Sequence, residues 1–411
     1  MSLLIKHIKQ LVQVDDGSLG IRKGEAQGKL PIIEDAWLLM DKGLIIDFGN
    51  MSTCPTMASQ VVNAKGKFVL PSYVDSHTHL VFAASREGEF EDRINGLTYE
   101  EIAAKGGGII NSAKKLADMP EEDLLEMAYH RLMRVKDLGT GAIEIKSGYG
   151  LSVDAEVKML KVIQKLKSIS PIPIKATFLG AHAIPTAHKA NPQHYIDEII
   201  NVMLPKIAAE NLADYVDVFC EKNYFSVEQM DTILKAAAKF GLKPKVHVNQ
   251  FNALGGIANA IENNAVSVDH LEVINDDDID ALKQSNCIAT LLPSCSFFIN
   301  IPYANAKKLI ENDVPVALAT DYNPGSTPSG NMSFVLSLAC LKLNMTPQQA
   351  INAATINAAH ALNLENELGT IKKGKRANVF ITKKMPSLAY LPYSFGENLI
   401  ETVIINGEIQ K

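Results

Sequence analysis

The chain has 411 residues, of which 47% are hydrophobic and 21% charged, as in an ordinary soluble globular protein. A net charge of −6 offers no basic surface to a nucleic acid, and no apolar run is long enough to span a bilayer. Five cysteines without a Cys-x-x-Cys pair predict reduced thiols rather than disulfides or a structural zinc site. The N-terminus makes a poor signal peptide, so we expect a cytoplasmic protein without nucleic-acid or membrane partners.

The two ends of the chain are predicted to be rich in β structure. In residues 1–70, short apolar runs are punctuated by Gly and Asp, which is typical of strands joined by turns. Residues 363–411 return to this pattern, and Asn406 followed by Gly407 predicts the turn of a hairpin. Because these segments flank a different middle, we predict one small β-sandwich domain built from both termini.

The middle of the chain, residues 71–362, alternates between predicted strands and helices. Eight strands are predicted, at 68–77, 141–147, 174–182, 215–220, 243–249, 267–271, 288–293 and 316–322. Helical periodicity lies between most of them, for example at 120–138, 153–166, 226–240 and 276–284. Two more helices, at 331–343 and 346–362, follow the last strand.

Eight parallel strands with intervening helices define an α/β fold, the (β/α)8 TIM-type barrel. The alternation alone also fits a doubly wound sheet. The barrel is favoured because polar, ligand-type residues recur at the C-terminal ends of strands along the whole series. A barrel gathers those ends on one face.

Residues at three predicted strand ends can bind one metal ion. His77 and His79 are two apart, so in an extended strand their imidazoles point the same way. His247 ends the fifth strand and Asp321 the eighth. Three imidazoles and a carboxylate suit one divalent or trivalent ion, zinc or iron, with a position left for water that the ion activates. His270, at the end of the sixth strand, is placed beside the ion as a proton shuttle or electrophile.

Each of these residues, taken alone, is more ordinarily a core histidine or a helix-capping aspartate. Five of them at strand ends, in this order, resemble the amidohydrolase superfamily, and the helix and return strand after the barrel match its usual ending. The resemblance covers essentially the whole chain. Some members hold two metals bridged by a carbamylated lysine at the end of the fourth strand, but here 217–221 contains no lysine. Lys146, on the second strand, is the nearest substitute, so a single metal is expected.

Finer motifs resemble, within the superfamily, the family that hydrolyses 4-imidazolone-5-propanoate to N-formimidoyl-L-glutamate in histidine degradation. They lie at 85–90, 96–103, 106–108, 144–150, 178–182 and 319–326. The ring amide of that substrate is neutral and requires an activated water, and its propanoate tail requires a fixed cation. The resemblance implies a cyclic-amide hydrolase, this small molecule as its partner, and a homodimer.

Several residues are predicted to bind the substrate. Arg86, in a loop after the metal pair, can grip the carboxylate with two parallel hydrogen bonds; otherwise it makes a surface salt bridge. Tyr149, between two glycines, offers a hydroxyl on a loop that can approach closely, or packs as an aromatic. His182, at the end of the third strand, can steady a developing oxyanion. The remaining predicted contacts are Gln250, Asn323, Gly325 and Ser326, with Tyr99 as a weaker candidate.

Gln250 departs from the pattern, because many relatives carry an acid three residues after the fifth-strand histidine. A glutamate there can shuttle protons, whereas an amide cannot. We therefore predict that Gln250 only orients the substrate. Asp321 and His270 are the predicted catalytic residues, with Asp321 carrying the proton of the attacking water to the leaving ring nitrogen.

Two alternative functions remain open on the sequence. The first is a mononuclear deaminase that releases ammonia from an amidine or aminated heterocycle. Gln250 argues against it, because such enzymes resemble one another in keeping a glutamate at this position. The second is a non-catalytic amidohydrolase-like scaffold, against which the intact set of five metal-site residues argues.

Overall fold

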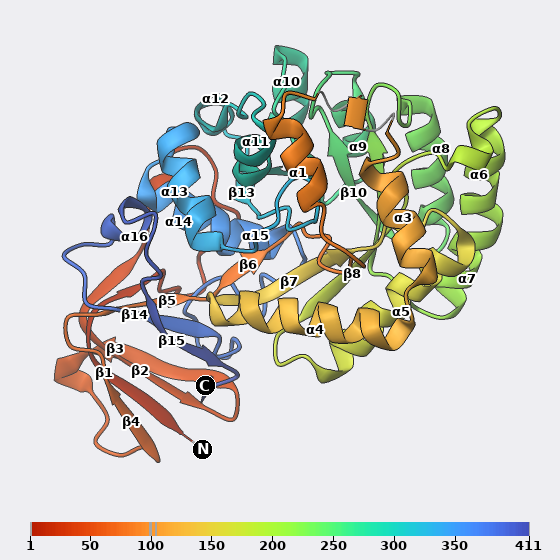
Figure 1. The fold of residues 1–411 in the computed structure, drawn as a ribbon. Helices are drawn as coiled ribbons and strands as arrows, with labels where there is room; N and C mark the ends of the chain where they lie inside the picture. The colour runs from red at the N-terminus through yellow and green to blue at the C-terminus, as the bar shows by residue number, and fades with distance from the viewer. Residues whose placement is uncertain (1, 98–100, 103–104, 411) are drawn as a thin grey trace.

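The computed structural model describes residues 2–97, 101–102 and 105–410, and Tyr99 lies outside them. Within these residues the strands form two eight-stranded sheets. One is a parallel barrel, and the other is a mixed sheet beside which both chain ends lie (Figure 1). The predicted α/β barrel with a β unit from both termini is thereby confirmed, while the boundaries at residues 70 and 362 stay a prediction.

The barrel strands are joined by parallel pairing in chain order, which a doubly wound sheet does not show. They are β6 (Tyr73–Asp75), β7 (Thr140–Lys146), β8 (Ile174–Ala181), β9 (Tyr215–Cys220), β10 (Lys243–Val248), β11 (Ser267–His270), β12 (Ile288–Leu291) and β13 (Val316–Leu318). The first and last strands meet just beyond their ends. There the amide of Asp321 donates to the carbonyl of His77 at 3.0 Å, and the amide of His79 donates to the carbonyl of Tyr322 at 2.9 Å. The closure of the barrel therefore brings two predicted metal-binding segments side by side.

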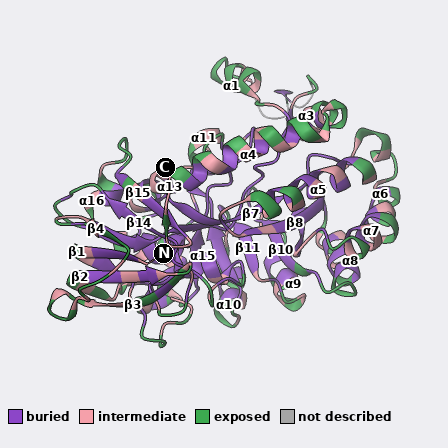
Figure 2. Cartoon of the chain, turned by 90° about the horizontal axis from the view of Figure 1, so that it is seen from below, coloured by how far each residue is buried: buried purple, intermediate pink, exposed green. Residues whose placement is uncertain are grey.

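Helices surround the barrel strands, which are largely buried, and exposed residues occur along these helices (Figure 2). Those between barrel strands are α1 (Glu87–Ile94), α3 (Gly108–Asp118), α4 (Glu121–Asp137), α5 (Val153–Ile169), η3 (Thr186–His188), α6 (Pro192–Glu198), η4 (Ile199–Met203), α7 (Leu204–Ala209), α8 (Val227–Ala238), α9 (Gly256–Glu262), α10 (Asp276–Lys283), α11 (Pro293–Ile299) and α12 (Ala306–Glu311). Ser226 and Gln229 form a capping box that starts α8, so a local signal sets this boundary. None of the described helices has both the length and the apolar character to cross a bilayer.

The helices outside the strand series are α13 (Met332–Lys342), α14 (Pro347–Ala354), α15 (Ile356–His360), α16 (Tyr390–Tyr393), η1 (Gly24–Gly28) and η2 (Met51–Thr53). The single helix predicted over 346–362 is wrong, because Thr355 leaves helical geometry between α14 and α15 (φ −128°, ψ −89°). The Thr355 hydroxyl lies 2.7 Å from Gln13 Oε1, a residue of the N-terminal segment. The break between α14 and α15 therefore occurs at a residue that hydrogen-bonds to the N-terminal segment of the chain.

The mixed sheet has the order β16-β15-β14-β5-β1-β2-β3, with β4 also paired to β1. Its strands are β1 (Leu3–Val12), β2 (Ile32–Asp41), β3 (Leu44–Asn50), β4 (Gln60–Asn63), β5 (Phe68–Pro71), β14 (Val379–Thr382), β15 (Ile400–Ile405) and β16 (Glu408–Ile409). By hydrogen bonding the predicted sandwich is thus one mixed sheet, in which β5 joins the N-terminal strands to β14. The predicted hairpin turn is confirmed, since Asn406 and Gly407 both have positive φ (50° and 73°).

The strand predicted over 68–77 divides between the two sheets. Its first part, β5, pairs with β1 and β14, and its second part, β6, pairs with β7. Ser72 lies between them, and its amide donates to the carbonyl of Asn378 at 3.0 Å. Side chains alternate along β5, so Phe68 and Leu70 enter the main core while Val69 enters the core of the mixed sheet. This segment therefore anchors the mixed sheet to the base of the barrel strand that leads to His77.

Candidate active site

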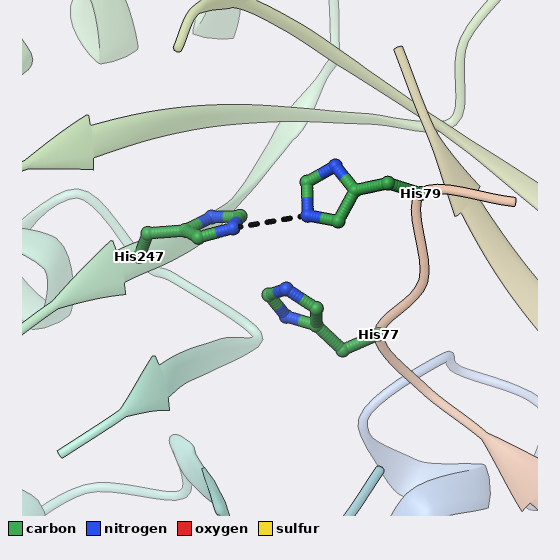
Figure 3. Close-up of side chains that lie close together, drawn as sticks. All are labelled: His77, His79 and His247. Carbon is green, nitrogen blue, oxygen red and sulfur yellow. Dashed lines mark hydrogen bonds between the residues drawn. The ribbon is translucent and has the colours of Figure 1, made fainter. Parts of the chain in front are cut away.

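Three buried imidazoles converge at the C-terminal end of the barrel (Figure 3). His77 and His79 follow β6, and His247 lies in β10. The Nε2 atoms of His79 and His247 are 3.3 Å apart. Asp321, after β13, places its Oδ1 3.6 Å from Nε2 of both His77 and His79. Ligand atoms of the three histidines thus lie within 4.8 Å of one another, and the Asp321 carboxylate lies against two of them.

Two of these imidazoles are oriented by buried carboxylates behind them. Nδ1 of His77 donates to Asp269 at 2.7 Å, and Nδ1 of His247 donates to Asp217 at 2.8 Å. With the proton on Nδ1, the Nε2 lone pair is free, and among the described residues His77 Nε2 has no hydrogen-bond partner. Burial lowers the pKa of all three imidazoles well below the usual value, so they are neutral ligands at pH 7. The donor set therefore fits a zinc or iron ion with oriented ligands.

Lys146 lies behind the orienting aspartates. Its Nζ is 2.9 Å from Asp217, 2.9 Å from Glu144 and 3.7 Å from Asp269. Burial alone would lower the pKa of Lys146, but the three carboxylates outweigh it and raise that pKa. Carbamylation requires a neutral amine, so this ammonium is a poor candidate for a metal-bridging carbamate. The arrangement favours a single metal.

His270 and Asp321 lie beside the imidazole cluster. The His270 ring centroid is 5.3 Å from that of His247, and its Nδ1 lies 3.4 Å from Glu272 Oε1. Burial opposes the imidazolium, but Glu272 and other carboxylates raise the pKa of His270. Burial also raises the pKa of Asp321 to about 6. An imidazole and a carboxylate in one cavity are groups that serve as general acids and bases.

Arg86 lines a cavity that His79, His247 and Asp321 also line. Its Nε donates to the hydroxyl of Ser112 at 2.9 Å, and its guanidinium lies 5.6 Å from the ring centroid of Tyr149. Nη2 is buried, without a hydrogen-bond partner in the described part of the chain. A Cβ at Gly325 would lie 2.3 Å from Arg86 Nη1, so only glycine leaves room for the guanidinium there. A fixed, incompletely satisfied guanidinium suits an anionic ligand group.

The loop that carries Tyr149 is held by one buried carboxylate. Glu156 accepts hydrogen bonds from the amides of Gly148 and Gly150, at 3.0 and 2.7 Å. Gly148 has φ +110° and its carbonyl accepts from Nδ1 of His182 at 2.9 Å. Burial lowers the pKa of His182 to about 4. His182 is therefore neutral at pH 7, with Nε2 as a hydrogen-bond acceptor.

The turn after β13 is organised by the side chain of Asn323. Its Oδ1 accepts from the amides of Gly325 and Ser326, both at 2.8 Å. Its Nδ2 donates to the Asp321 carbonyl and to the Ser326 hydroxyl, both at 2.7 Å. The Ser326 hydroxyl in turn donates to Asp321 Oδ2 at 3.1 Å. Asn323 thus fixes the turn that aims the Asp321 carboxylate.

One cavity gathers the predicted site residues. Its walls include His79, Arg86, Tyr149, His182, His247, Gln250, His270, Asp321, Asn323, Gly325 and Ser326. His77 lies buried beside it, with its ring centroid 4.4 Å from that of His247. Gln250 is anchored by a donation from Nε2 to the thiol of Cys295, at 3.5 Å. The roles predicted for these residues are taken up below as proposals.

Sequence reasoning missed part of the site. Glu89, Arg93, Phe219 and Tyr224 also line the cavity, and nothing in the local sequence sets them apart. Asp217, Asp269 and Glu272 lie at the Nδ1 atoms of His247, His77 and His270. For Asp217 and Asp269 a signal existed, because a charged residue inside an apolar strand is buried only with a partner.

Comparison with known proteins defines the class. The profile of the amidohydrolase family matches residues 68–409. Solved structures of E. coli guanine deaminase (TM-score 0.74, 16% identity, 100% of this chain and 99% of that chain) and of an adenosine deaminase from Xanthomonas campestris with bound zinc (TM-score 0.72, 14% identity, 99% and 92%) share the fold.

Relatives with higher sequence identity indicate which amidohydrolases this chain belongs with. Imidazolonepropionases from Flavobacterium johnsoniae and Christiangramia forsetii are 56% and 54% identical, over 100% of this chain and of theirs. The chain therefore belongs to the amidohydrolase family and, within it, to the imidazolonepropionases.

Proposed function

We propose that this chain is a metal-dependent hydrolase that opens the ring of 4-imidazolone-5-propanoate to give N-formimidoyl-L-glutamate. The observation that carries the proposal is that two kinds of site meet at one cavity, with His77 buried beside it. His77, His79, His247 and Asp321 present converging metal-ligand atoms, and Arg86 presents a buried guanidinium nitrogen without a partner among the described residues. The first suits activation of water, and the second suits the propanoate tail. The full-length relatives support the same activity.

A single zinc or iron ion is assigned to His77, His79, His247 and Asp321. When bound, such an ion lowers the pKa of a water ligand and polarises a carbonyl. Arg86 receives the propanoate carboxylate. Nε2 of His182 accepts a hydrogen bond from a ring N–H of the substrate, because its Nδ1 already donates to Gly148. This role replaces the predicted donation to an oxyanion.

Tyr149 and Gln250 line the cavity beside these groups and are assigned contacts to the substrate through the phenol and the amide. The turn of Asn323, Gly325 and Ser326 closes the same wall. Because the Asn323 side chain is bonded within its own turn, we assign it to holding Asp321 and shaping the wall.

Proton transfer falls to Asp321, with His270 beside it. The oxygen of water bonds to the ring carbonyl carbon, the ring C–N bond breaks, and Asp321 carries a proton of that water to the leaving nitrogen. The Asp321 carboxylate lies 3.6 Å from Nε2 of His77 and of His79 and accepts a hydrogen bond from the Ser326 hydroxyl, which holds it within reach of a water at the proposed metal site. Gln250 cannot share this task, since an amide does not titrate.

The decisive test follows the loss of imidazolone-propanoate absorbance, with and without prior chelation. We expect turnover by the metal-loaded protein, loss on chelation, and recovery on adding zinc or iron. Asp321→Asn should lower kcat by at least about 100-fold, while Gln250→Glu stays active. An active Asn variant would refute the assignment of Asp321. Release of ammonia from aminated heterocycles, without imidazolone hydrolysis, would instead favour a deaminase.

Three further proposals accompany the activity. The ion is zinc or iron, which metal analysis of the protein as isolated tests. The chain forms a homodimer, which light scattering tests. The enzyme works in the cytoplasm, where a histidine-degrading hydrolase meets its substrate, and fractionation of cells tests this location.

A further inference from the structure

Three imidazoles at the centre of the barrel each have a carboxylate at Nδ1. Asp269 serves His77, Asp217 serves His247, and Glu272 serves His270. The first two pairs orient proposed metal ligands. His270 is not in that ligand set, so the carboxylate behind it calls for a different explanation.

The backbone around this third pair is held in an unfavourable conformation. His270 and Leu271 have φ of +91° and +62°, although neither is glycine. Such conformations are unfavourable and persist only where the surroundings impose them. Here the Leu271 amide donates to the carbonyl of Val248 at 3.3 Å, and the Val273 amide donates to that of Asn249 at 2.9 Å. The turn is thereby tied to β10, and it returns the Glu272 side chain to the His270 ring.

Glu272 is a buried carboxylate with an incomplete set of partners. Its Oε1 accepts from His270 Nδ1 at 3.4 Å and from the Ser296 hydroxyl at 3.1 Å. Its Oε2 is buried and, within residues 2–97, 101–102 and 105–410, has no hydrogen-bond partner. Burying such a group costs free energy unless it is fully bonded. A structural role alone does not account for a carboxylate here, because a smaller neutral acceptor would satisfy Ser296.

We infer that Glu272 is a positioning residue, which holds His270 in one ring orientation and in the tautomer with the proton on Nδ1. The Nε2 lone pair then faces the cavity that His270 lines, where it can accept a proton during turnover. This is the arrangement in which a base is itself oriented by a third group. The inference rests on the proposed hydrolase function and adds the residue that prepares His270 for it.

A different explanation of the same cluster is a second cation. Ligand atoms of His270, Glu272 and Cys295 lie within 4.8 Å of one another. The two explanations differ in what they require. A second cation predicts two equivalents of metal per chain, and loss of one of them on changing Glu272 or Cys295. A positioning role predicts one equivalent in every variant.

The test uses full-length protein loaded with zinc and labelled with 15N-histidine. Nitrogen chemical shifts distinguish the two neutral tautomers, and the signals of His270 are assigned by their absence in His270→Gln. In the unmodified protein, at a pH at which His270 is neutral, we expect the Nδ1–H tautomer. Glu272→Gln should mix the tautomers, because an amide presents both a donor and an acceptor. We expect kcat to fall about 100-fold while KM changes less than about twofold.

The matched control is Ser296→Ala, which removes the other partner of Glu272 and leaves the contact with His270. It should keep the tautomer and change kcat less than about threefold. An Nε2–H tautomer in the unmodified protein overturns the inference, as does an unchanged kcat in Glu272→Gln or a second equivalent of zinc. The tautomer is read without substrate. Failure of imidazolone hydrolysis therefore refutes the proposed function and leaves the tautomer result standing as a separate finding.

Discussion

The two sheets of this protein differ in the polarity of the side chains that they bury. The barrel strands carry charged residues that are fully buried: Glu144, Lys146, Asp217, Lys245 and Asp269. The core of the mixed sheet is apolar and includes Ile5, Leu38, Val69, Val379 and Ile404. Burying charges costs free energy that apolar packing does not. In the barrel, buried carboxylates orient imidazoles of the proposed site. The mixed sheet holds none of the proposed site residues, and none of its described strands buries a charged side chain.

The largest expected effect comes from Lys146→Met, which removes the cation shared by Asp217, Glu144 and Asp269 and leaves Asp269 with Lys245 at 3.9 Å. We expect the free energy of unfolding to fall by about 3–5 kcal/mol, because Asp217 and Glu144 stay buried after losing this ion pair. We also expect zinc affinity to fall about 10- to 100-fold, since the aspartates orient His77 and His247. Urea unfolding and competition with a chelator measure the two effects. Unchanged zinc affinity would contradict the proposed link.

Leu38→Ala, in the core of the mixed sheet, supplies the matched comparison. It should lower the free energy of unfolding by about 2–5 kcal/mol through the cavity it leaves. Zinc affinity and KM should stay within about twofold, because distant sites act independently. The same unfolding and chelator measurements apply. A loss of zinc affinity as large as that of Lys146→Met would mean that stability, not orientation, controls the metal centre.

Arg86→Lys keeps a positive charge in the barrel cavity but removes the planar guanidinium group. We expect KM to rise about 10- to 100-fold, with kcat little changed, because charged hydrogen bonds of about 1.5–3 kcal/mol are lost. Steady-state kinetics measure this effect. An analogue whose propanoate is a neutral amide provides the control, and it should bind both proteins equally weakly. If Arg86→Lys weakened the analogue as much as the substrate, the guanidinium would not be the carboxylate site.

The smallest expected effect is on the pH dependence of stability and comes from Lys375, which precedes β14. The Lys375 ammonium donates to the Leu368 carbonyl and to the Thr370 hydroxyl. Burial lowers its pKa to about 8 from 10.5. Between these values the unfolded chain binds the extra proton, so this group makes stability rise with pH and contributes no slope below about 8. We expect a gain of about 1–2 kcal/mol, allowing for solvent screening. Urea unfolding at both ends of this range should show the gain in the unmodified protein and lose it in Lys375→Met.

Local signals in the sequence are sufficient for much of the fold. Ser226 with Gln229 sets the start of α8, and Asn406 with Gly407 sets the last hairpin turn, because each signal acts within a few residues. Two of the errors concern long-range partners. The sequence predicts one strand over residues 68–77, and pairing with β14 on one side and with β7 on the other divides these residues between the two sheets. The break at Thr355 has a partner in Gln13, a residue far away in the sequence.

The sequence by itself determined the barrel and the kinds of atoms at its strand ends, because strand and helix periodicity and ligand chemistry belong to each segment alone. Only the tertiary structure decided which atoms face one another. Asp217, Asp269 and Glu272 act through hydrogen bonds to imidazoles on other strands or across a strained turn, and Lys146 through contacts across the barrel. Their roles depend on distance in space, which the closing of the barrel sets and no local pattern of residues encodes.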